Sequence, residues 1–185
     1  MSGIGQSCIY WFGSHLSEMN AKMPTAYLAG PDVFLPNAKA EGKRKCEILL
    51  RCGIQGLFPL DNEIVEGKEM AHEIFLQNVA LINRSDIVLA NITPFRGPSL
   101  DPGTAWEIGY AYARGTPVIC YGSRATYLER CREHGWEGAV AGWDREGMLI
   151  EDFGEQENLM IARCAALIVG TFEEAALAAQ KILGV

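Results

Sequence analysis

Two carboxylates, Asp101 and Glu107, stand close together in the segment Asp101-Pro-Gly-Thr-Ala-Trp-Glu107-Ile-Gly109. The Pro-Gly pair predicts a turn at Asp101 and a helix just after it, which puts Glu107 about one turn into that helix. The partial positive charge of a helix N-terminus should keep Glu107 ionised and fixed in direction. An anchored anion beside a second acid suits the cleavage of a sugar–base bond, in which one group attacks the anomeric carbon and the other manages charge and protons.

The same residues also fit a purely structural role. Thr104-x-x-Glu107 is a capping box, in which Thr104 caps the helix and Glu107 bonds back to the Thr104 N–H. The preceding loop favours the chemical role, because Ile87–Asn91 has the composition of a buried strand and residues 92–102 form a long Pro/Gly-rich connection. Long loops at the carboxyl ends of strands are where open α/β sheets bind ligands.

Apolar strands and amphipathic helices alternate along the chain from residue 25. Strands are predicted at 25–29, 55–58, 87–91, 117–121 and 166–169, and helices at 38–52, 68–85, 103–114, 125–133 and 158–164. Asn37 is the expected cap of the first helix, and Thr171-x-x-Glu174 opens a last helix with its own capping box. This alternation predicts an α/β fold: a doubly wound, mostly parallel sheet flanked by helices, flavodoxin/Rossmann-like, in a single domain.

The domain is expected to span residues 23–185. A chain of 185 residues that is 49% hydrophobic has enough apolar material for one core. Residues 1–22 are expected to be a poorly ordered N-terminal extension, since their apolar run 8–12 is too short for a signal sequence and lacks a basic start. No segment is long enough to span a membrane. We therefore expect a cytoplasmic protein.

The net charge and the motifs of the chain limit the classes of partner and cofactor that can be expected. A net charge of −7 and a pI near 5.0 argue against nucleic-acid polymers and anionic membranes, but not against an uncharged nucleoside. The six cysteines form no CxxC pair and the three histidines have no metal-ligand spacing, so no metal is expected. Neither G-x-G-x-x-G nor GxxxxGK[ST] is present, which argues against a dinucleotide cofactor or a P-loop.

Several short motifs occur in a fixed order along the chain. They are Tyr27-Leu-Ala-Gly-Pro31, Pro59-Leu-Asp-Asn62, Ser85-Asp86, Pro94-Phe-Arg-Gly97, Asp101-x-Gly-Thr-x-x-Glu-x-Gly109 and Asn158-Leu-Met160. In this order they resemble the nucleoside 2-deoxyribosyltransferase family, and the resemblance runs from about Tyr27 to the C-terminus. The fifth motif alone is also found in nucleotide N-glycosidases of related fold.

The resemblance implies three catalytic roles. Glu107 would attack the anomeric carbon and form a covalent deoxyribosyl-enzyme, which the incoming base resolves with retention of configuration. Tyr27 would donate its hydroxyl to Glu107, although a strand tyrosine can also simply pack in the core. Asp101 would bind a sugar hydroxyl or pass a proton to the departing base.

The resemblance also implies a set of substrate-binding residues. Asp61 and Asn62 would line the pocket, unless they form a plain Asx turn. At Asn78 some members carry an aspartate that faces the base, and an amide there is a poor proton donor. Asn158 and Met160 would enter a neighbouring subunit's site, unless Asn158 only caps a helix. The remaining expected contacts come from Gly30, Arg96 and Gly103.

The implied activity is transfer of 2-deoxyribose between purine or pyrimidine bases in nucleoside salvage, without a cofactor. The partners would be deoxynucleosides, free nucleobases and further copies of the chain in a dimer-based tetramer or hexamer. Two other functions remain open. One is an N-glycosidase that uses Glu107 with water as acceptor, for which only Arg96 and Ser99 could contact a phosphate. The other is a non-catalytic nucleobase-binding module, against which the retention of Tyr27, Asp101 and Glu107 argues.

Overall fold

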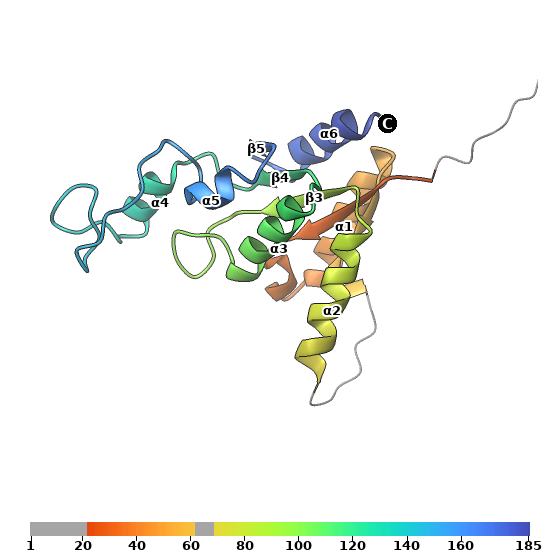
Figure 1. Cartoon of the computed structure of the whole chain (residues 1–185), viewed down its shortest axis with the longest axis horizontal. Coiled ribbons are helices and arrows are strands. Elements are labelled where there is room, and N and C mark those ends of the chain that lie inside the picture. The colour runs from red at the N-terminus through yellow and green to blue at the C-terminus, as the bar shows by residue number, and fades with distance from the viewer. Residues whose placement is uncertain (1–21, 62–68) are drawn as a thin grey trace, which may run out of the picture.

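A parallel sheet with helices on both faces forms the body of the protein (Figure 1). The computed structural model describes residues 22–61 and 69–185. Its five strands lie in the order β2-β1-β3-β4-β5, and every neighbouring pair is parallel. The strands are β1 (Thr25–Ala29), β2 (Gln55–Leu57), β3 (Ile87–Asn91), β4 (Val118–Tyr121) and β5 (Leu167–Val169). The predicted fold class is therefore confirmed.

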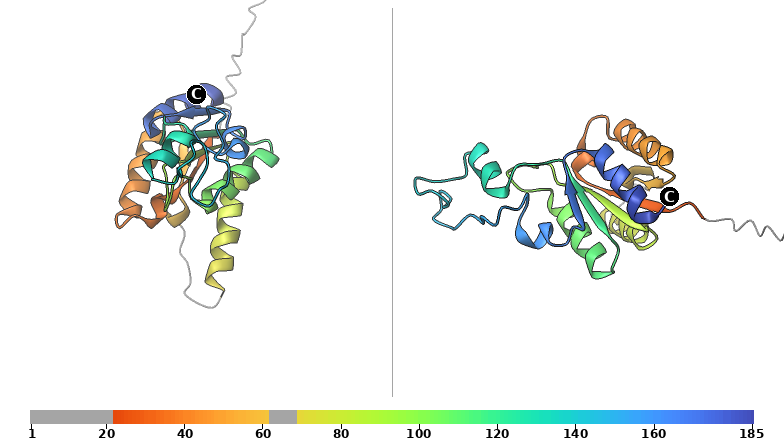
Figure 2. Two further views of the ribbon diagram at one scale, coloured as in Figure 1. Left: turned by 90° about the vertical axis from the view of Figure 1, so that its left-hand side faces the viewer. Right: turned by 90° about the horizontal axis from the view of Figure 1, so that it is seen from above.

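Helices cover both faces of this sheet (Figure 2). The main helices are α1 (Ala38–Arg51), α2 (Met70–Asn83), α3 (Pro102–Ala113) and α6 (Phe172–Leu183), with shorter α4 (Tyr127–Glu133) and α5 (Leu159–Ala162). Two 3-10 turns, η1 (Pro31–Phe34) and η2 (Pro59–Asp61), follow β1 and β2 directly. Both turns therefore lie at the carboxyl edge of the sheet.

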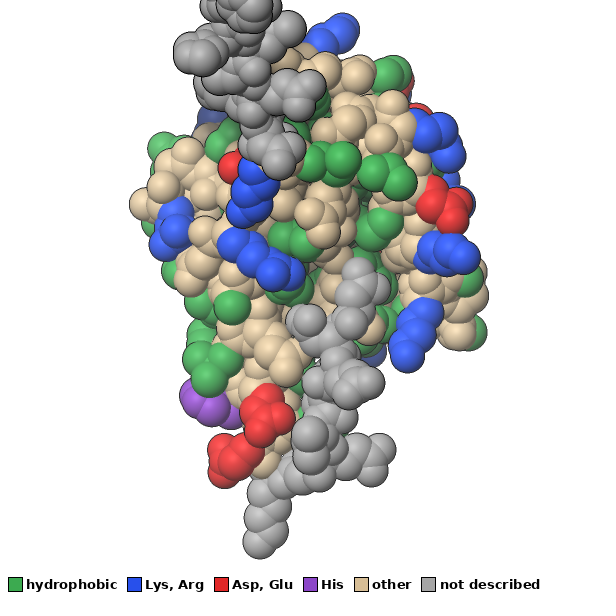
Figure 3. All heavy atoms as spheres, turned by 90° about the vertical axis from the view of Figure 1, so that its right-hand side faces the viewer, with side chains coloured by type: hydrophobic (Ala, Val, Ile, Leu, Met, Phe, Trp, Pro, Cys, Tyr) green, Lys and Arg blue, Asp and Glu red, His purple; other side chains and the backbone are tan. Residues whose placement is uncertain are grey.

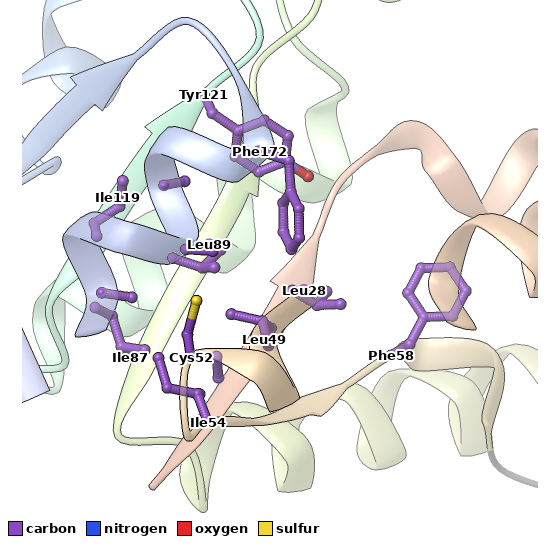
Figure 4. Packing of buried hydrophobic residues seen from close by; sticks show 14 residues of the cluster. Leu28, Leu49, Cys52, Ile54, Phe58, Ile87, Leu89, Ile119, Tyr121 and Phe172 are labelled. Atoms are coloured by element: carbon purple, nitrogen blue, oxygen red, sulfur yellow. The ribbon is translucent and has the colours of Figure 1, made fainter. Parts of the chain in front are cut away.

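The core consists of two layers, one on each face of the sheet. Because successive strand residues point to opposite faces, alternate residues of β1 and β3 enter different layers. Leu28 and Leu89 pack with α1 and α6, as Figure 4 shows around Leu49 and Phe172. Tyr27 and the other alternate residues pack with α2 and α3 on the opposite face. The central strands are buried on both faces, which explains their nearly uninterrupted apolar sequences.

The predicted elements are all present, with boundaries that shift by a few residues. No described boundary shifts by more than two residues; α4, for example, begins at Tyr127 rather than at residue 125. Asn37 stands at the N-cap position of α1, as expected. Its side chain makes no capping hydrogen bond, so that part of the expectation is wrong. The capping box at Thr171 and Glu174 forms as predicted.

Residues 122–157 form an arm that carries α4 and extends away from the sheet (Figure 1). Two isolated bridges, Glu137 with Asp144 and Trp143 with Leu149, give the tip of the arm its shape. On the opposite end of the molecule, Lys and Arg side chains stand at several separate places across the surface (Figure 3). No helix among the described residues is long and apolar enough to cross a membrane.

Candidate active site

A hydrogen bond joins a strand tyrosine to a helix carboxylate at the centre of the fold. The Tyr27 hydroxyl on β1 donates to Glu107 Oε1 on α3 at 2.5 Å. Tyr27 is fully buried, and its ring packs in the core layer shared with Ile108 and Ala111 of α3. The two roles considered for Tyr27 are thus combined, because the ring packs while the hydroxyl orients Glu107.

Asp101, rather than Thr104, caps helix α3. Asp101 Oδ2 accepts hydrogen bonds from the Thr104 backbone N–H at 2.9 Å and from the Thr104 hydroxyl at 3.1 Å. The helix begins at Pro102, one residue earlier than predicted, because proline fits the first helical position. The alternative role, a capping box of Thr104 and Glu107, is therefore not formed. Glu107 lies beyond the first turn, and its carboxylate accepts the hydrogen bond from Tyr27.

The pKa of Glu107 is raised to a net value of about 7. Burial is the main cause, and the nearby negative charge of Asp101 acts in the same direction. The hydrogen bond from Tyr27 acts in the opposite direction and lowers the pKa of Glu107. The expectation that the helix N-terminus keeps Glu107 fully ionised is wrong, because the dipole effect fades within the first turn while burial does not. Glu107 is thus balanced between its acid and its carboxylate near neutral pH. Burial and Glu107 also raise the pKa of Tyr27 well above its usual value, so the hydroxyl remains a donor.

Glu107 lines a cavity of about 320 Å³, which is within the usual size range of small-molecule sites. Five residues expected at the site line it: Gly30, Asn78, Asp101, Gly103 and Glu107. The cavity lies where η1, η2, α2 and the start of α3 meet at the carboxyl edge of the sheet. This is the position at which doubly wound sheets bind ligands.

The apolar wall of the cavity was not predicted from the sequence. Val33, Phe34, Leu60 and Ile74 supply this wall, and Gln77 adds an amide next to that of Asn78. Apolar surface suits a flat uncharged ring, while the two amides offer both donors and acceptors. Position alone could have found Val33 and Phe34, since they follow the strand that carries Tyr27.

A buried network fixes the turn η1 against the cavity. Lys45 Nζ lies 2.8 Å from Asp32 Oδ2 and donates to the Tyr121 hydroxyl at 2.9 Å. Asn91 Nδ2 donates to the same Asp32 oxygen at 3.1 Å. Gly30 precedes this turn with φ 155°, and a Cβ there would come within 2.7 Å of the Asn91 side chain. A side chain at position 30 is therefore excluded both by conformation and by space.

Arg96 and Asp61 lie beside the cavity rather than among its lining residues. Arg96 adopts a left-handed φ of 56° and stacks over the rings of Phe95 and Phe34, the latter a lining residue. Asp61 ends η2, whose first two residues line the cavity. Asn62, expected to accompany Asp61, lies outside the described residues.

Asn158 and Met160 do not line this chain's cavity. Asn158 caps α5: its side-chain oxygen accepts from the Met160 N–H at 3.0 Å, and its Nδ2 donates to Glu151 at 2.7 Å. Asn158 thus has the structural role of a helix cap, which was the alternative to a role in a neighbouring subunit's site. Met160 is 68% exposed, so its side chain is available to another molecule.

Within residues 22–61 and 69–185, no group of three or more His, Cys, Asp or Glu side chains is placed to hold a metal ion. The chemistry that the described site offers is that of its own carboxylates, hydroxyl and amides. A buried carboxylate held by a hydroxyl can act as a nucleophile or as a proton carrier, because its pKa lies near neutral pH.

The sheet order and the Tyr27–Glu107 pair define a doubly wound α/β protein with a carboxylate at the base of a small-molecule cavity. The family described as nucleoside 2-deoxyribosyltransferase matches residues 26–160. The chain belongs to this family. Membership supports a transferase role, and it confirms the resemblance inferred from the ordered motifs.

Individual proteins show the same likeness. An uncharacterized protein of Schizosaccharomyces pombe is 31% identical over 159 residues, which cover 75% of each chain. A 2-desoxiribosyltransferase from Leishmania mexicana is 32% identical, with a TM-score of 0.68 over 84% of this chain and 95% of its own. A 2-deoxyribosyltransferase from Bacillus psychrosaccharolyticus is 20% identical, with a TM-score of 0.54 over 84% of this chain and 95% of its own, and it supports the fold alone.

Proposed function

We propose that this protein transfers the 2-deoxyribosyl group of a 2'-deoxyribonucleoside to a second nucleobase through a covalent intermediate on Glu107. The observation that carries the proposal is the hydrogen bond from Tyr27 to Glu107 at the base of a cavity that Asp101 also lines. Family membership gives the reaction class. The local geometry supplies a nucleophile that is oriented, buried and ionisable near neutral pH.

In the first step, Glu107 attacks through Oε2, because Oε1 accepts the hydrogen bond from Tyr27. A bond forms between Oε2 and the anomeric carbon of the sugar as the bond from that carbon to the base nitrogen breaks. The electron pair of the broken bond leaves with the base, which then takes up a proton. Burial favours this step, since attack removes the negative charge from a carboxylate that is poorly solvated.

In the second step, a new base attacks the same carbon from the face that the first base vacated. The bond from the anomeric carbon to Glu107 breaks, the carboxylate is restored, and the incoming base gives up the proton of its attacking nitrogen, which the Asp101 carboxylate can accept. Two displacements at one carbon return the original configuration, so the product is a nucleoside of retained configuration. If water replaces the base, the same intermediate gives hydrolysis, which makes the N-glycosidase a side reaction of this mechanism.

The proton of the departing base and the binding of the sugar both involve Asp101. One of its oxygens, Oδ2, is held by Thr104, which fixes the carboxyl group at the cavity wall. Asn78 and Gln77 lie in the same cavity, where their amides can hydrogen-bond the edge of a base but cannot supply a proton readily. We therefore assign base binding to the two amides, and we assign to Asp101 either a hydrogen bond from a sugar hydroxyl or the relay of a proton to the departing base.

The site should prefer deoxyribose to ribose. A 2-deoxy sugar lacks an electron-withdrawing hydroxyl, so its oxocarbenium-like transition state forms more easily. The Tyr27 hydroxyl and Glu107 Oε1 are already bonded to each other at 2.5 Å, so a 2'-hydroxyl beside them would have to break that bond or stay without a partner. Burying an unpaired hydroxyl costs on the order of 1–3 kcal/mol, which corresponds to roughly ten- to a hundredfold discrimination.

Asn158 and Met160 are assigned to the site of a neighbouring subunit, as the family resemblance implies. The exposure of Met160 and the absence of α5 residues from the described lining of the chain's own cavity support this assignment. The working unit would then be at least a dimer with two-fold symmetry, from which a tetramer or hexamer is built.

The proposal is tested by a product profile. The purified protein is incubated with deoxythymidine alone and with deoxythymidine plus adenine, and the products are separated by chromatography. Base transfer predicts deoxyadenosine only in the second mixture. Free deoxyribose at the same rate in both mixtures would instead make the protein a hydrolase. Unchanged substrate in both mixtures, and also with deoxyinosine as the donor, would favour a binding module.

A further inference from the structure

A buried ion pair lies at the point where the arm meets the active-site loop. Arg130 on α4 and Glu157, just before α5, are each 1% exposed. Arg130 Nη2 lies 2.6 Å from Glu157 Oε2. Among the described side chains, Arg130 Nε is a buried polar atom without a hydrogen-bond partner. Neither residue lines the cavity or belongs to the mechanism above.

The two oxygens of Glu157 bind two different segments of backbone. Oε2 accepts from the Leu100 N–H at 3.1 Å, and Oε1 accepts from the Asn158 N–H at 3.0 Å. Leu100 directly precedes Asp101, the cap of α3. One carboxylate thus holds both the residue before Asp101 and the residue at the start of α5.

The guanidinium of Arg130 braces the same two segments. It donates to the Ile92 carbonyl at 3.2 Å, where the loop before Asp101 begins, and to the Gln156 carbonyl. The loop of residues 92–100 is therefore held at both ends, by Arg130 at its start and by Glu157 at its end. Side-chain bonds of this kind, made in a low-dielectric interior, fix backbone position strongly.

Stability alone does not account for such a pair. Removing two charges from water costs several kcal/mol per ion, and apolar side chains of similar volume often stabilise a fold as well or better. An unpartnered Nε adds to that cost. The geometry of the pair is its distinctive property, since it joins two segments that the sheet does not connect.

We infer that Arg130 and Glu157 are positioning residues that hold Asp101 and Asn158 in one fixed arrangement. This inference rests on the proposed function, in which Asp101 serves its own site and Asn158 serves the neighbour's site. The pair then couples the geometry of two active sites within an oligomer. Loosening it should lower kcat through Asp101 and raise KM for the deoxynucleoside through Asn158.

The test uses Arg130→Met/Glu157→Leu, which removes the pair without leaving a buried charge alone and is therefore expected to fold. We expect kcat to fall at least about tenfold and KM to rise at least about threefold in a variant that circular dichroism shows to be folded. A defect of folding alone would lower the active fraction and leave KM unchanged. Arg132→Gln is the matched control, because it removes the exposed Arg132–Glu137 pair from the same helix. Its kcat and KM should stay within about twofold.

Hydrogen exchange at the Leu100 and Asn158 backbone amides gives a readout that does not depend on activity. Both amides should exchange at least about tenfold faster in the double variant than in the control. If the double variant does not fold, Glu157→Gln takes its place, because its single carbonyl oxygen can hold only one of the two amides. A folded variant with unchanged kcat, KM and exchange would overturn the inference. A wild-type protein without transfer or hydrolysis would overturn the proposed function instead. Hydrogen exchange at the Leu100 and Asn158 backbone amides would still show whether the pair positions both segments.

Discussion

Tyr27 and Glu107 are 80 positions apart in the sequence, yet the tyrosine hydroxyl donates to the carboxylate at 2.5 Å. Tyr27 points from β1 into the layer where α3 packs, so the contact depends on the sheet and the helix being docked together. The hydrogen bond lowers the pKa of Glu107 while burial and Asp101 raise it, with a net value of about 7. The ionisation of the candidate nucleophile is thus set by its burial and by two neighbours, Tyr27 and Asp101.

Glu107→Ala should abolish base exchange. Removal of a nucleophile should cost at least about a thousandfold in rate, or roughly 4 kcal/mol of barrier. The measurement is kcat for deoxythymidine and adenine, with circular dichroism to show that the variant is folded. Glu47→Ala, at an exposed surface pair on α1, is the control and should keep its rate within about twofold. A folded Glu107→Ala protein with most of its rate would rule out the covalent mechanism.

Tyr27→Phe should move the acid limb of the pH–rate profile to higher pH. Attack needs the carboxylate of Glu107, so kcat/KM in the wild type should rise with pH through the pKa of about 7. The Tyr27 hydrogen bond lowers that pKa, and its loss therefore raises it. The measurement is kcat/KM as a function of pH for the wild type and for Tyr27→Phe. An acid limb that stayed in place or moved to lower pH would mean that Tyr27 does not set the ionisation of Glu107.

Glu107→Gln should stabilise the protein at alkaline pH. A folded-state pKa raised from 4.5 to about 7 means that folding favours the protonated acid, so the wild type loses stability as pH rises from 4.5 to 7. The glutamine can still accept from Tyr27 and has no such loss. The unfolding free energy of Glu107→Gln minus that of the wild type should grow by roughly 3 kcal/mol between pH 4.5 and 7 and then level off. Urea unfolding at several pH values measures it, and a difference independent of pH would contradict the raised pKa.

Mixing Glu107→Ala with Asn158→Ala should restore activity if Asn158 serves a neighbour's site. Each mixed dimer would contain one intact site, so random exchange of subunits should give about a quarter of wild-type activity. Mass-tagged subunits must first show that exchange has taken place. With exchange shown and no recovery, the site would lie within one chain and Asn158 would have only its role as the cap of α5.

Much of the fold was predictable because its signals are local. Strands buried on both faces give continuous apolar runs, as in Ile87–Asn91, and helix ends carry their own chemistry, as in the Thr171 capping box. The capping of α3 was wrong because Thr104 and Asp101 are both good N-caps, and only the exact start of the helix decides between them.

The site was only partly predictable. Asp101 and Glu107 stand in one motif, whereas the apolar wall from Val33, Leu60 and Ile74 comes from three segments that meet only in the folded chain. The pKa of Glu107 depends on burial, which local sequence does not report. Arg130 and Glu157 carried no sequence signal, because buried charges look like surface charges until the packing is known.

The configuration of the transferred product tests the central claim most directly. The wild-type protein is given deoxythymidine and adenine, and the anomeric configuration of the new nucleoside is determined by nuclear magnetic resonance from the first product formed. A covalent intermediate on Glu107 predicts deoxyadenosine with the configuration of the donor, because two displacements occur at one carbon. A product of inverted configuration would show a single displacement, and would contradict the covalent role of Glu107.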